Sequence, residues 1–225
     1  MKRALIFDMD GVLVDSIHLH AAAWKMAFSE EDIAISSDSI CRLEGANDRG
    51  IVDSILHHQG ISGSFDSFSS IAARKQAFFD LMDVKPFPGI TDCLKLLSEE
   101  YLLAVVSGSD RNAVDGILGR HFSVNFDAVV SGDDVIKGKP NPDPYLKALE
   151  YLGADPEDCI VFENAPYGVQ AAKNAGLYCI GIPTYVAPQL LEMADKVLAD
   201  HLNLMEYLHL LVQRGPESPF PVIFS

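Results

Sequence analysis

Two carboxylates, Asp8 and Asp10, lie where a short apolar run ends, and Gly11 follows them. Because alternate residues of an extended chain point to the same side, both carboxylates can face the edge of a sheet where open α/β sheets bind ligands. Paired carboxylates suit a hard divalent cation, beside which Asp8 can attack phosphorus while Asp10 exchanges protons with the leaving group. An acidic surface turn is the alternative interpretation.

Two later segments carry groups that bind phosphate. Ser107 and Gly108 follow an apolar run, and a hydroxyl with backbone N–H groups near the start of a helix can cradle phosphate oxygens. Lys139 lies in a loop rich in Pro and Gly, where its ammonium can balance both a nucleophilic carboxylate and a transferred phosphoryl group. A solvated lysine is the alternative at this position.

A second pair of oxygen ligands, Glu163 and Asn164, ends another apolar run, and Pro166 opens a helix soon after it. A carboxylate and an amide oxygen at this edge are suited to serve as additional Mg²⁺ ligands beside Asp8 and Asp10. Either residue could instead cap the helix or support a ligand from behind. The residues alone therefore leave open which of the two binds the metal.

The elements that must position these groups alternate along the chain. Short runs rich in Val, Ile or aromatic residues predict buried parallel strands at Ala4–Phe7, Leu102–Val106, Ala128–Val130, Cys159–Phe162 and Tyr178–Ile182. Helical patterns lie between them at Thr91–Glu100, Asp110–Phe122, Pro144–Leu152 and Pro166–Ala175. This alternation predicts an α/β fold with a doubly wound, mainly parallel sheet.

Residues 16–83 depart from this alternation. They offer three helical patterns and no strand, with the patterns at Ile17–Glu30, Asp48–Gln59 and Phe68–Met82. We therefore predict an α/β core formed by residues 1–15 and 84–225, and a helical cap at 16–83 inserted after the first strand. The return segment 84–89 has the Pro and Gly content of a stiff connector, which predicts a hinge for the cap. The Pro-rich end, 215–225, is predicted to be peripheral.

Composition excludes several classes of partner. The chain has 17 Lys and Arg against 32 Asp and Glu, a net charge of −15 that opposes binding to nucleic acid or an anionic membrane. The predicted partner is a small phosphorylated metabolite, whose binding requires locally concentrated positive charge. The four cysteines have no Cys-x-x-Cys spacing and are predicted to be reduced core residues. With no apolar signal segment, we expect a cytoplasmic protein, whose oligomeric state the sequence does not indicate.

Taken together, the motifs resemble those of the haloacid dehalogenase-like superfamily, in the same order and at strand ends: Asp8-x-Asp10, Ser107, Lys139 and Glu163-Asn164. The resemblance covers nearly the whole chain and implies a Rossmann-like core. It implies that Asp8 is the nucleophile and a Mg²⁺ ligand, and that Asp10 is the general acid/base and ligates through its backbone carbonyl. Ser107 and Lys139 would bind the phosphate, and the fourth motif the metal. That motif usually ends in Asp, so Asn164 predicts a working metal site of lowered affinity.

The predicted cap is similar to that of the beta-phosphoglucomutase branch and related sugar phosphatases. In that branch a His shortly before Ala-Trp, here His20, and a cap lysine, best matched by Lys75, contact the acid/base loop. A charge on a solvated helix face is the alternative for Lys75. Mutases of the branch also bind a second phosphate through an Arg three residues after a cap glycine. Here that place holds Asp48, and Arg49 comes one residue late.

The charge of Asp48 would repel a second phosphate, so we predict a Mg²⁺-dependent phosphatase for a sugar or polyol phosphate. A phosphosugar mutase is the alternative, because a one-residue shift of the loop would return Arg49 to the cap cavity. A binding protein without turnover is a further alternative, which the presence of Asp8, Asp10 and Lys139 disfavours. A dehalogenase is disfavoured too, because its metal-free chemistry has no use for Asp10 or a metal-binding fourth motif.

Overall fold

The computed structural model describes residues 3–43 and 45–216, so the predicted peripheral tail lies outside the described residues from 217 onward. The described strands form one six-stranded sheet in the order β3-β2-β1-β4-β5-β6, in which all neighbours pair in parallel. The strands are β1 (Ala4–Phe7), β2 (Leu102–Val106), β3 (Ala128–Val130), β4 (Cys159–Glu163), β5 (Tyr178–Gly181) and β6 (Lys196–Val197). This sheet confirms the predicted doubly wound α/β fold.

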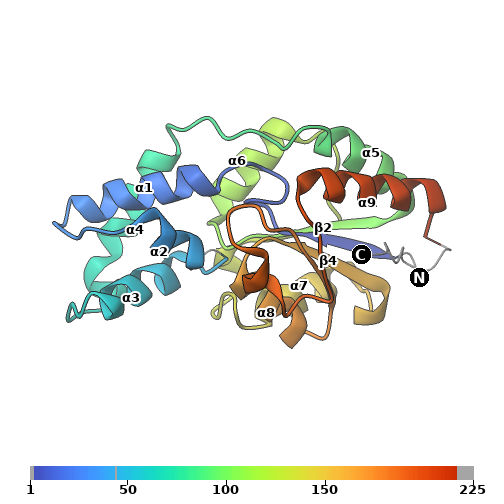
Figure 1. The fold of residues 1–225 in the computed structure, drawn as a ribbon. Coiled ribbons are helices and arrows are strands. Elements are labelled where there is room, and N and C mark those ends of the chain that lie inside the picture. Colours follow the sequence, from blue (N-terminus) through green and yellow to red (C-terminus); the bar gives the residue numbers. More distant parts are fainter. Residues whose placement is uncertain (1–2, 44, 217–225) are drawn as a thin grey trace.

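Helices cover both faces of the sheet (Figure 1). They are α5 (Ile90–Glu100), α6 (Arg111–His121), α7 (Asp143–Leu152), α8 (Pro166–Asn174) and α9 (His201–Arg214). Because alternate residues of a strand point to opposite faces, Leu5 and Phe7 join the core under α5, α6 and α9, whereas Ala4 and Ile6 join the core under α7 and α8. Burial on both faces explains why the strands read as uninterrupted apolar runs.

The segment between β1 and α5 contains helices only, as far as the structure describes it. These helices are α1 (Ile17–Ser29), α2 (Ser37–Arg42), α3 (Asp48–His58) and α4 (Phe65–Phe79), and they enclose an apolar cluster of their own around Trp24 and Phe28. We predicted three helical patterns here, so α2 is an addition. Its six residues are too few to show a period, and the Ser36 side chain caps it by accepting a hydrogen bond from the Ser39 N–H.

Two connectors join this helical segment to the sheet and run side by side. Val14 on the outgoing connector forms an antiparallel bridge with Pro86 on the returning one. The Asp15 N–H donates to the Lys85 carbonyl at 2.8 Å, and the Phe87 N–H donates to the Leu13 carbonyl at 3.0 Å. The two crossings are thus tied to each other, and the helical segment adjoins the carboxyl ends of the strands (Figure 1).

Most elements begin and end within one to three residues of the predicted positions, but β6 and α9 had no counterpart among the predicted elements. β6 has only two residues, which is too short for a periodic signal. α9 carries buried residues at helical spacing, Leu204, Tyr207, Leu208 and Leu211, and the Asp200 carboxylate caps it by accepting from the Asn203 N–H. It packs against α5 and completes the outer layer on that face.

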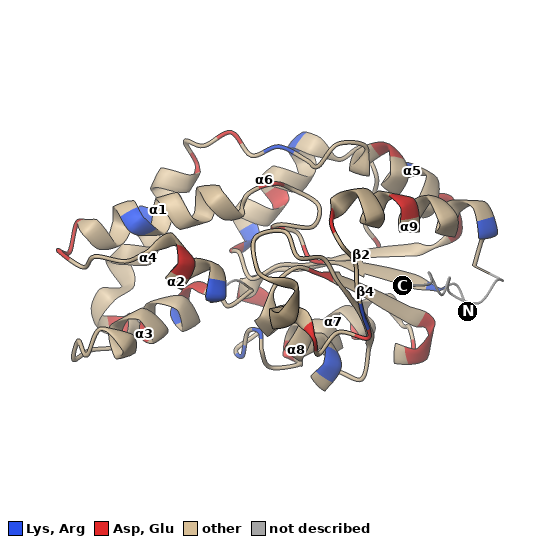
Figure 2. Ribbon diagram, viewed as in Figure 1, with Lys and Arg blue, Asp and Glu red and all other residues tan. Residues whose placement is uncertain are grey.

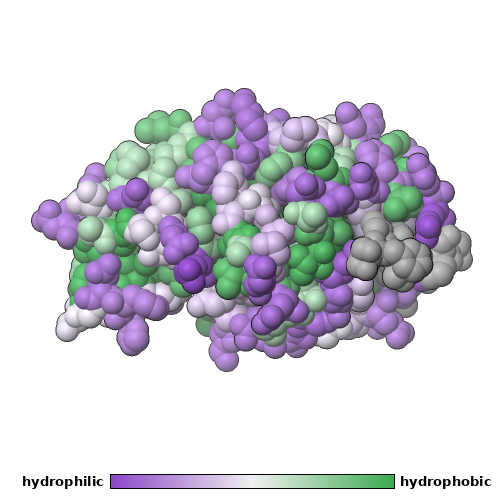
Figure 3. Space-filling view, in the orientation of Figure 1, coloured by the Kyte–Doolittle hydropathy of each residue, from purple (hydrophilic) through white to green (hydrophobic). Residues whose placement is uncertain are grey.

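The surface and the cysteines agree with the composition. Asp and Glu lie on helices of both parts of the molecule, with Lys and Arg scattered between them (Figure 2), and hydrophilic residues cover much of the face in Figure 3. Cys93, Cys159 and Cys179 are buried free thiols as predicted, whereas Cys41 is only half-buried and so departs from the predicted core position. Among the described residues, no helix has the length and apolar composition needed to cross a membrane.

Candidate active site

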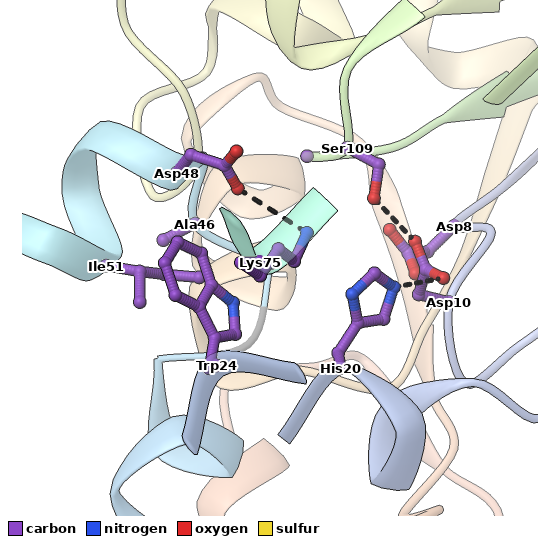
Figure 4. A pocket seen from close by; sticks show the side chains of 11 residues that line it. Asp8, Asp10, His20, Trp24, Ala46, Asp48, Ile51, Lys75 and Ser109 are labelled. Atoms are coloured by element: carbon purple, nitrogen blue, oxygen red, sulfur yellow. Dashed lines mark hydrogen bonds and ion pairs between the residues drawn. The ribbon is translucent and has the colours of Figure 1, made fainter. Parts of the chain in front are cut away.

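The carboxyl ends of the central strands meet the helical segment at one cavity (Figure 4). The sheet contributes Asp8 and Asp10, which follow β1, and Gly108 and Ser109, which follow β2. Facing them from the helical segment are His20, Trp24, Gly45, Ala46, Asp48, Ile51 and Lys75. The cavity volume is about 20 Å³, which is space for about one water molecule.

Asp8 lines the cavity, and Lys139 neutralises its buried carboxylate. The Lys139 ammonium donates to Asp8 Oδ1 and to Glu163 Oε1, both at 2.5 Å, and to the Val106 carbonyl at 3.2 Å. Burial raises the pKa of Asp8 above its usual range, although Lys139 opposes that shift. Burial alone would lower the pKa of Lys139, but the two carboxylates raise it above its usual value. Lys139 is therefore a fixed positive charge beside the candidate nucleophile.

Asp10 accepts hydrogen bonds on both carboxylate oxygens. Oδ1 is hydrogen-bonded to Ser16 Oγ at 2.5 Å and to His20 Nε2 at 2.9 Å. Oδ2 accepts from the hydroxyls of Ser107 and Ser109, each at 3.2 Å. Burial alone would raise the pKa of Asp10, but its charged and hydrogen-bonding neighbours, His20 foremost, hold it well below the usual range. In this arrangement Asp10 is an ionised group that can accept a proton. Ser16 and Ser109 were not among the predicted site residues.

The predicted phosphate cradle after β2 is only partly open to the cavity. Ser107 is buried and does not line the cavity, since its hydroxyl bonds Asp10 and accepts from the Ser109 N–H at 3.1 Å. Gly108 does line it, and a methyl group at Gly108 would lie 2.9 Å from the Ala46 carbonyl oxygen. Only glycine permits this close approach of the helical segment to the sheet. The cavity is thus closed by direct contact between the two parts.

Glu163 and Asn164 point in different directions. Glu163 Oε1 accepts from Lys139 and from the Tyr145 hydroxyl at 3.0 Å, and its Oε2 accepts from the Ala165 N–H at 2.9 Å. Asn164 Oδ1, in contrast, is buried and has no hydrogen-bond partner among the described residues. An unpaired buried amide oxygen is costly, so its presence here fits a site for a ligand that carries positive charge.

The oxygen groups of Asp8 and Asn164 suit Mg²⁺ in type. Asp8 offers a carboxylate and Asn164 an amide oxygen, both hard ligands, whereas the Glu163 carboxylate is engaged by Lys139 and Tyr145. Residues 3–43 and 45–216 contain no group of three or more His, Cys, Asp or Glu side chains placed to hold a metal. A cation here would therefore depend on amide and backbone oxygens as well as on carboxylates.

Gly168 in the first turn of α8 lies against the Glu163 carboxylate, and a methyl group there would overlap it. We expect Gly168→Ala to lower the free energy of unfolding by about 3 kcal/mol, because the buried carboxylate cannot move without breaking its contacts. Phosphate release should also fall, since Glu163 holds Lys139. Urea denaturation measures the first effect.

The matched control for this substitution is Gly116→Ala on α6, where no heavy atom lies within 4 Å of the added methyl group. There the change should raise the free energy of unfolding by about 0.5–1 kcal/mol, because alanine favours a helix. If Gly168→Ala unfolded at the same urea concentration as the unaltered protein, the proposed packing of Glu163 would be wrong.

The cap lysine and histidine face the cavity. His20 stacks on Phe79 with ring centroids 4.0 Å apart. The ammonium of Lys75 lies 5.3 Å from the Trp24 ring centroid and 5.5 Å from that of Phe79, and Lys75 is only 2% exposed. The alternative of a solvated helix face is therefore wrong for Lys75. Trp24 also lines the cavity, although it was not among the predicted site residues and served only to identify His20.

Arg49 does not line the cavity, so its predicted role as a substrate-binding residue of the cap is wrong for this arrangement. Its guanidinium donates to Asp66 Oδ1 at 2.9 Å and lies over the Phe65 ring, 4.7 Å from the centroid, with half of the side chain exposed. Consecutive residues of a helix differ by about 100° in direction, so Asp48, the residue before it on α3, faces the cavity while Arg49 faces the start of α4.

Comparisons with known proteins find similar hydrolases and mutases. A sequence profile described as haloacid dehalogenase-like hydrolase matches residues 5–182. A validoxylamine A 7'-phosphate phosphatase from Streptomyces hygroscopicus subsp. limoneus is 30% identical, covering 89% of this chain and 94% of its own. A beta-phosphoglucomutase from Bacillus subtilis is 31% identical, and the match covers 80% of this chain and 83% of the relative. The crystal structure of a beta-phosphoglucomutase from Clostridium difficile superposes with a TM-score of 0.79 at 25% identity. The superposition covers 95% of this chain and 98% of that structure.

Proposed function

This chain belongs to the haloacid dehalogenase-like hydrolase family, and on that premise we propose that it is a Mg²⁺-dependent phosphatase of sugar or polyol phosphates that forms a phosphoaspartate on Asp8. The observation that carries the proposal is the pairing of Asp8 with the buried Lys139 ammonium at a cavity that Asp10 also lines. The similarity to a validoxylamine A 7'-phosphate phosphatase supports hydrolysis as the reaction.

The proposed reaction has two halves, in which Asp8 is the nucleophile and Asp10 transfers protons. One Asp8 carboxylate oxygen bonds to phosphorus, while the bond from phosphorus to the ester oxygen breaks and Asp10 protonates that oxygen. In the second half Asp10 takes a proton from water, which attacks the phosphoaspartate and releases inorganic phosphate. Lys139 and the N–H groups around Gly108 stabilise the charge on the phosphoryl oxygens. The lowered pKa of Asp10 favours its carboxylate form, which accepts a proton in the second half and donates that proton in the first half of the next cycle.

Asp8 and Asn164 are the groups we assign to Mg²⁺, with the backbone carbonyl of Asp10. The bound cation supplies positive charge to the phosphoryl oxygens and lowers the repulsion between them and Asp8. Glu163 then acts on Lys139, which it holds at 2.5 Å, rather than on the metal.

Substrate entry requires the helical segment to move. A cavity of about 20 Å³ cannot hold a sugar phosphate, so the arrangement described here is a closed one. We propose that residues 16–83 form a cap that turns on the paired connectors at Val14 and Pro86, relative to a core of 1–15 and 84–225. Closure then excludes water and brings His20 to Asp10.

The position of Arg49 favours a phosphatase over a mutase. A mutase has to hold a second phosphate in the cap, and Arg49 is instead held by Asp66 outside the cavity. The test supplies a panel of sugar and polyol phosphates with Mg²⁺ and follows free phosphate. A parallel reaction supplies glucose 1-phosphate with a bisphosphate primer. Free phosphate from the panel is expected, and glucose 6-phosphate formed without free phosphate would overturn the preference for hydrolysis.

Asn164→Asp should tighten Mg²⁺ binding by about tenfold, because a second carboxylate replaces a neutral amide oxygen in the same place. Isothermal titration calorimetry with Mg²⁺ alone measures the affinity without reference to turnover. Asp92→Asn on the exposed face of α5 provides a control for altered net charge and should leave the affinity unchanged. Equal affinities for the Asn164→Asp variant and the unaltered protein would remove Asn164 from the metal site.

A further inference from the structure

The cap side of the cavity contains one pair of opposite charges, Asp48 on α3 and Lys75 on α4, as far as the described residues show. Asp48 Oδ1 and Lys75 Nζ are 3.7 Å apart (Figure 4). That separation is within range of an ion pair but too long for a hydrogen bond. Neither group takes part in a hydrogen bond with the other described residues, so both keep their capacity to bind something in the cavity.

The surroundings bury the Lys75 side chain and leave the Asp48 side chain partly exposed. The Lys75 side chain is 3% exposed and packs against Trp24 and Phe79, whereas the Asp48 side chain is 29% exposed. The rest of the cap wall consists of His20, Gly45 and the apolar side chains of Trp24, Ala46 and Ile51. The carboxylate thus neutralises the lysine within an otherwise largely apolar wall, and the cap offers no net charge to the part of a substrate that leaves.

Capping of α3 does not account for Asp48. The start of α3 is already capped by Asn47, whose side-chain oxygen accepts from the Gly50 N–H at 3.0 Å. The Asp48 carboxylate is therefore not required as the cap. It lines the cavity, whereas Arg49 is hydrogen-bonded to Asp66 outside it.

We propose that Asp48 determines substrate specificity as a charge filter. Together with Lys75 it binds a hydroxyl of a neutral leaving group and rejects a leaving group that carries a second phosphate or a carboxylate. A hydroxyl oxygen fits between the two groups at about 2.8 Å from each, accepting from the ammonium and donating to the carboxylate. A second anion would meet the Asp48 carboxylate and find Lys75 already neutralised. This inference rests on the proposed phosphatase function and narrows its substrates to monophosphates of neutral polyols and sugars.

The test compares two substrates that share the transferred phosphate and differ at the far end of the chain. Glucitol 6-phosphate ends in a hydroxymethyl group and 6-phosphogluconate in a carboxylate. The ratio of their kcat/KM values cancels effects on the common chemistry and isolates the leaving-group subsite. The unaltered protein should favour glucitol 6-phosphate. Asp48→Asn frees Lys75 and should raise the ratio of 6-phosphogluconate to glucitol 6-phosphate by about tenfold.

Two further variants make the test decisive. Asp38→Asn on α2 removes one exposed cap carboxylate away from the cavity and should leave the ratio unchanged. Lys75→Gln leaves Asp48 unpaired, so the ratio should fall, the opposite of the Asp48→Asn result. If Asp48→Asn behaves like Asp38→Asn, or if both cavity variants leave the ratio unchanged, Asp48 is not a charge filter.

A failure of the proposed function would be visible separately. If the unaltered protein released no phosphate from any ester, the phosphatase assignment would be wrong. The affinities of the same two compounds, measured by isothermal titration calorimetry, would then replace the rate constants. The same change in ratio on Asp48→Asn would still support the filter, and an unchanged ratio of affinities would overturn it.

Discussion

Asp8→Asn should reduce phosphate release by about four orders of magnitude, because the amide that replaces the carboxylate has no oxygen nucleophile to form the covalent intermediate. The amide is nearly isosteric, so the fold should persist. In the unaltered protein, incubation with a substrate followed by rapid acid quenching should leave a phosphorylated chain detectable by intact mass spectrometry. The Asp8→Asn chain should show no such species.

The control for this prediction is Asp10→Asn, which removes the proton-transfer group and leaves the nucleophile in place. That variant should also lose turnover, but its Asp8 should still accept a phosphoryl group from a substrate with a good leaving group, such as p-nitrophenyl phosphate. The two variants therefore separate the covalent step from the proton transfers. Turnover by Asp8→Asn at the rate of the unaltered protein would show that the proposed nucleophile is wrong.

The gathering of the site at one edge of the sheet could be predicted from the sequence. Parallel strands present their carboxyl ends on the same side, so a polar residue directly after each apolar run must lie near the others. Asp8 and Glu163 were assigned to that edge from strand ends, and in the structure both accept from the Lys139 ammonium at 2.5 Å. The direction of Glu163 follows from the same periodicity: Val161, two residues earlier, points to the face of α7 and α8, and Glu163 points there too.

The cap side of the site depended on information that a single sequence lacks. Lys75 lies at helical spacing between Ile71 and Phe79 on the buried face of α4. Its other ring partner, Trp24, belongs to α1, and only the packing of α4 on α1 brings the two together. Arg49 and Asp48 are adjacent, and Asp48 is the one at helical spacing from the buried Ile51. Helical periodicity gives the buried face of α3 and of α4, but the approach of that face to the edge of the sheet is a property of tertiary packing.

The short elements were missed for a related reason. α2 and β6 are held by contacts with the rest of the fold, and segments of this length carry no periodic signal of their own. The serines on Asp10 are similar: Ser16 comes from the start of the helical segment and Ser109 from the loop after β2. Neither hydroxyl differs in type or spacing from the many serines that only face solvent.

Lys139→Met should have the largest effect on stability among the substitutions considered, in addition to abolishing turnover. Lys139 is 4% exposed and balances Asp8 and Glu163, which are themselves buried. Removing the ammonium leaves two carboxylates without a counter-charge, and breaking a buried pair in this way costs about 3–5 kcal/mol. Chemical denaturation at neutral pH measures the loss, and phosphate release measures the loss of charge stabilisation at the phosphoryl oxygens.

The pH dependence and a second variant distinguish lost charge from lost packing. A buried carboxylate whose pKa is raised in the folded state is destabilising above its unfolded pKa, and that penalty declines as the pH falls through the folded value, because the group takes up a proton. The deficit of Lys139→Met should therefore shrink toward acid pH. Adding Glu163→Gln should restore part of the stability at neutral pH and none of the activity, because it removes one uncompensated charge but supplies no cation. If the deficit is the same at all pH values and in the double variant, methionine has disturbed packing alone, and the ammonium is not what holds the two carboxylates together.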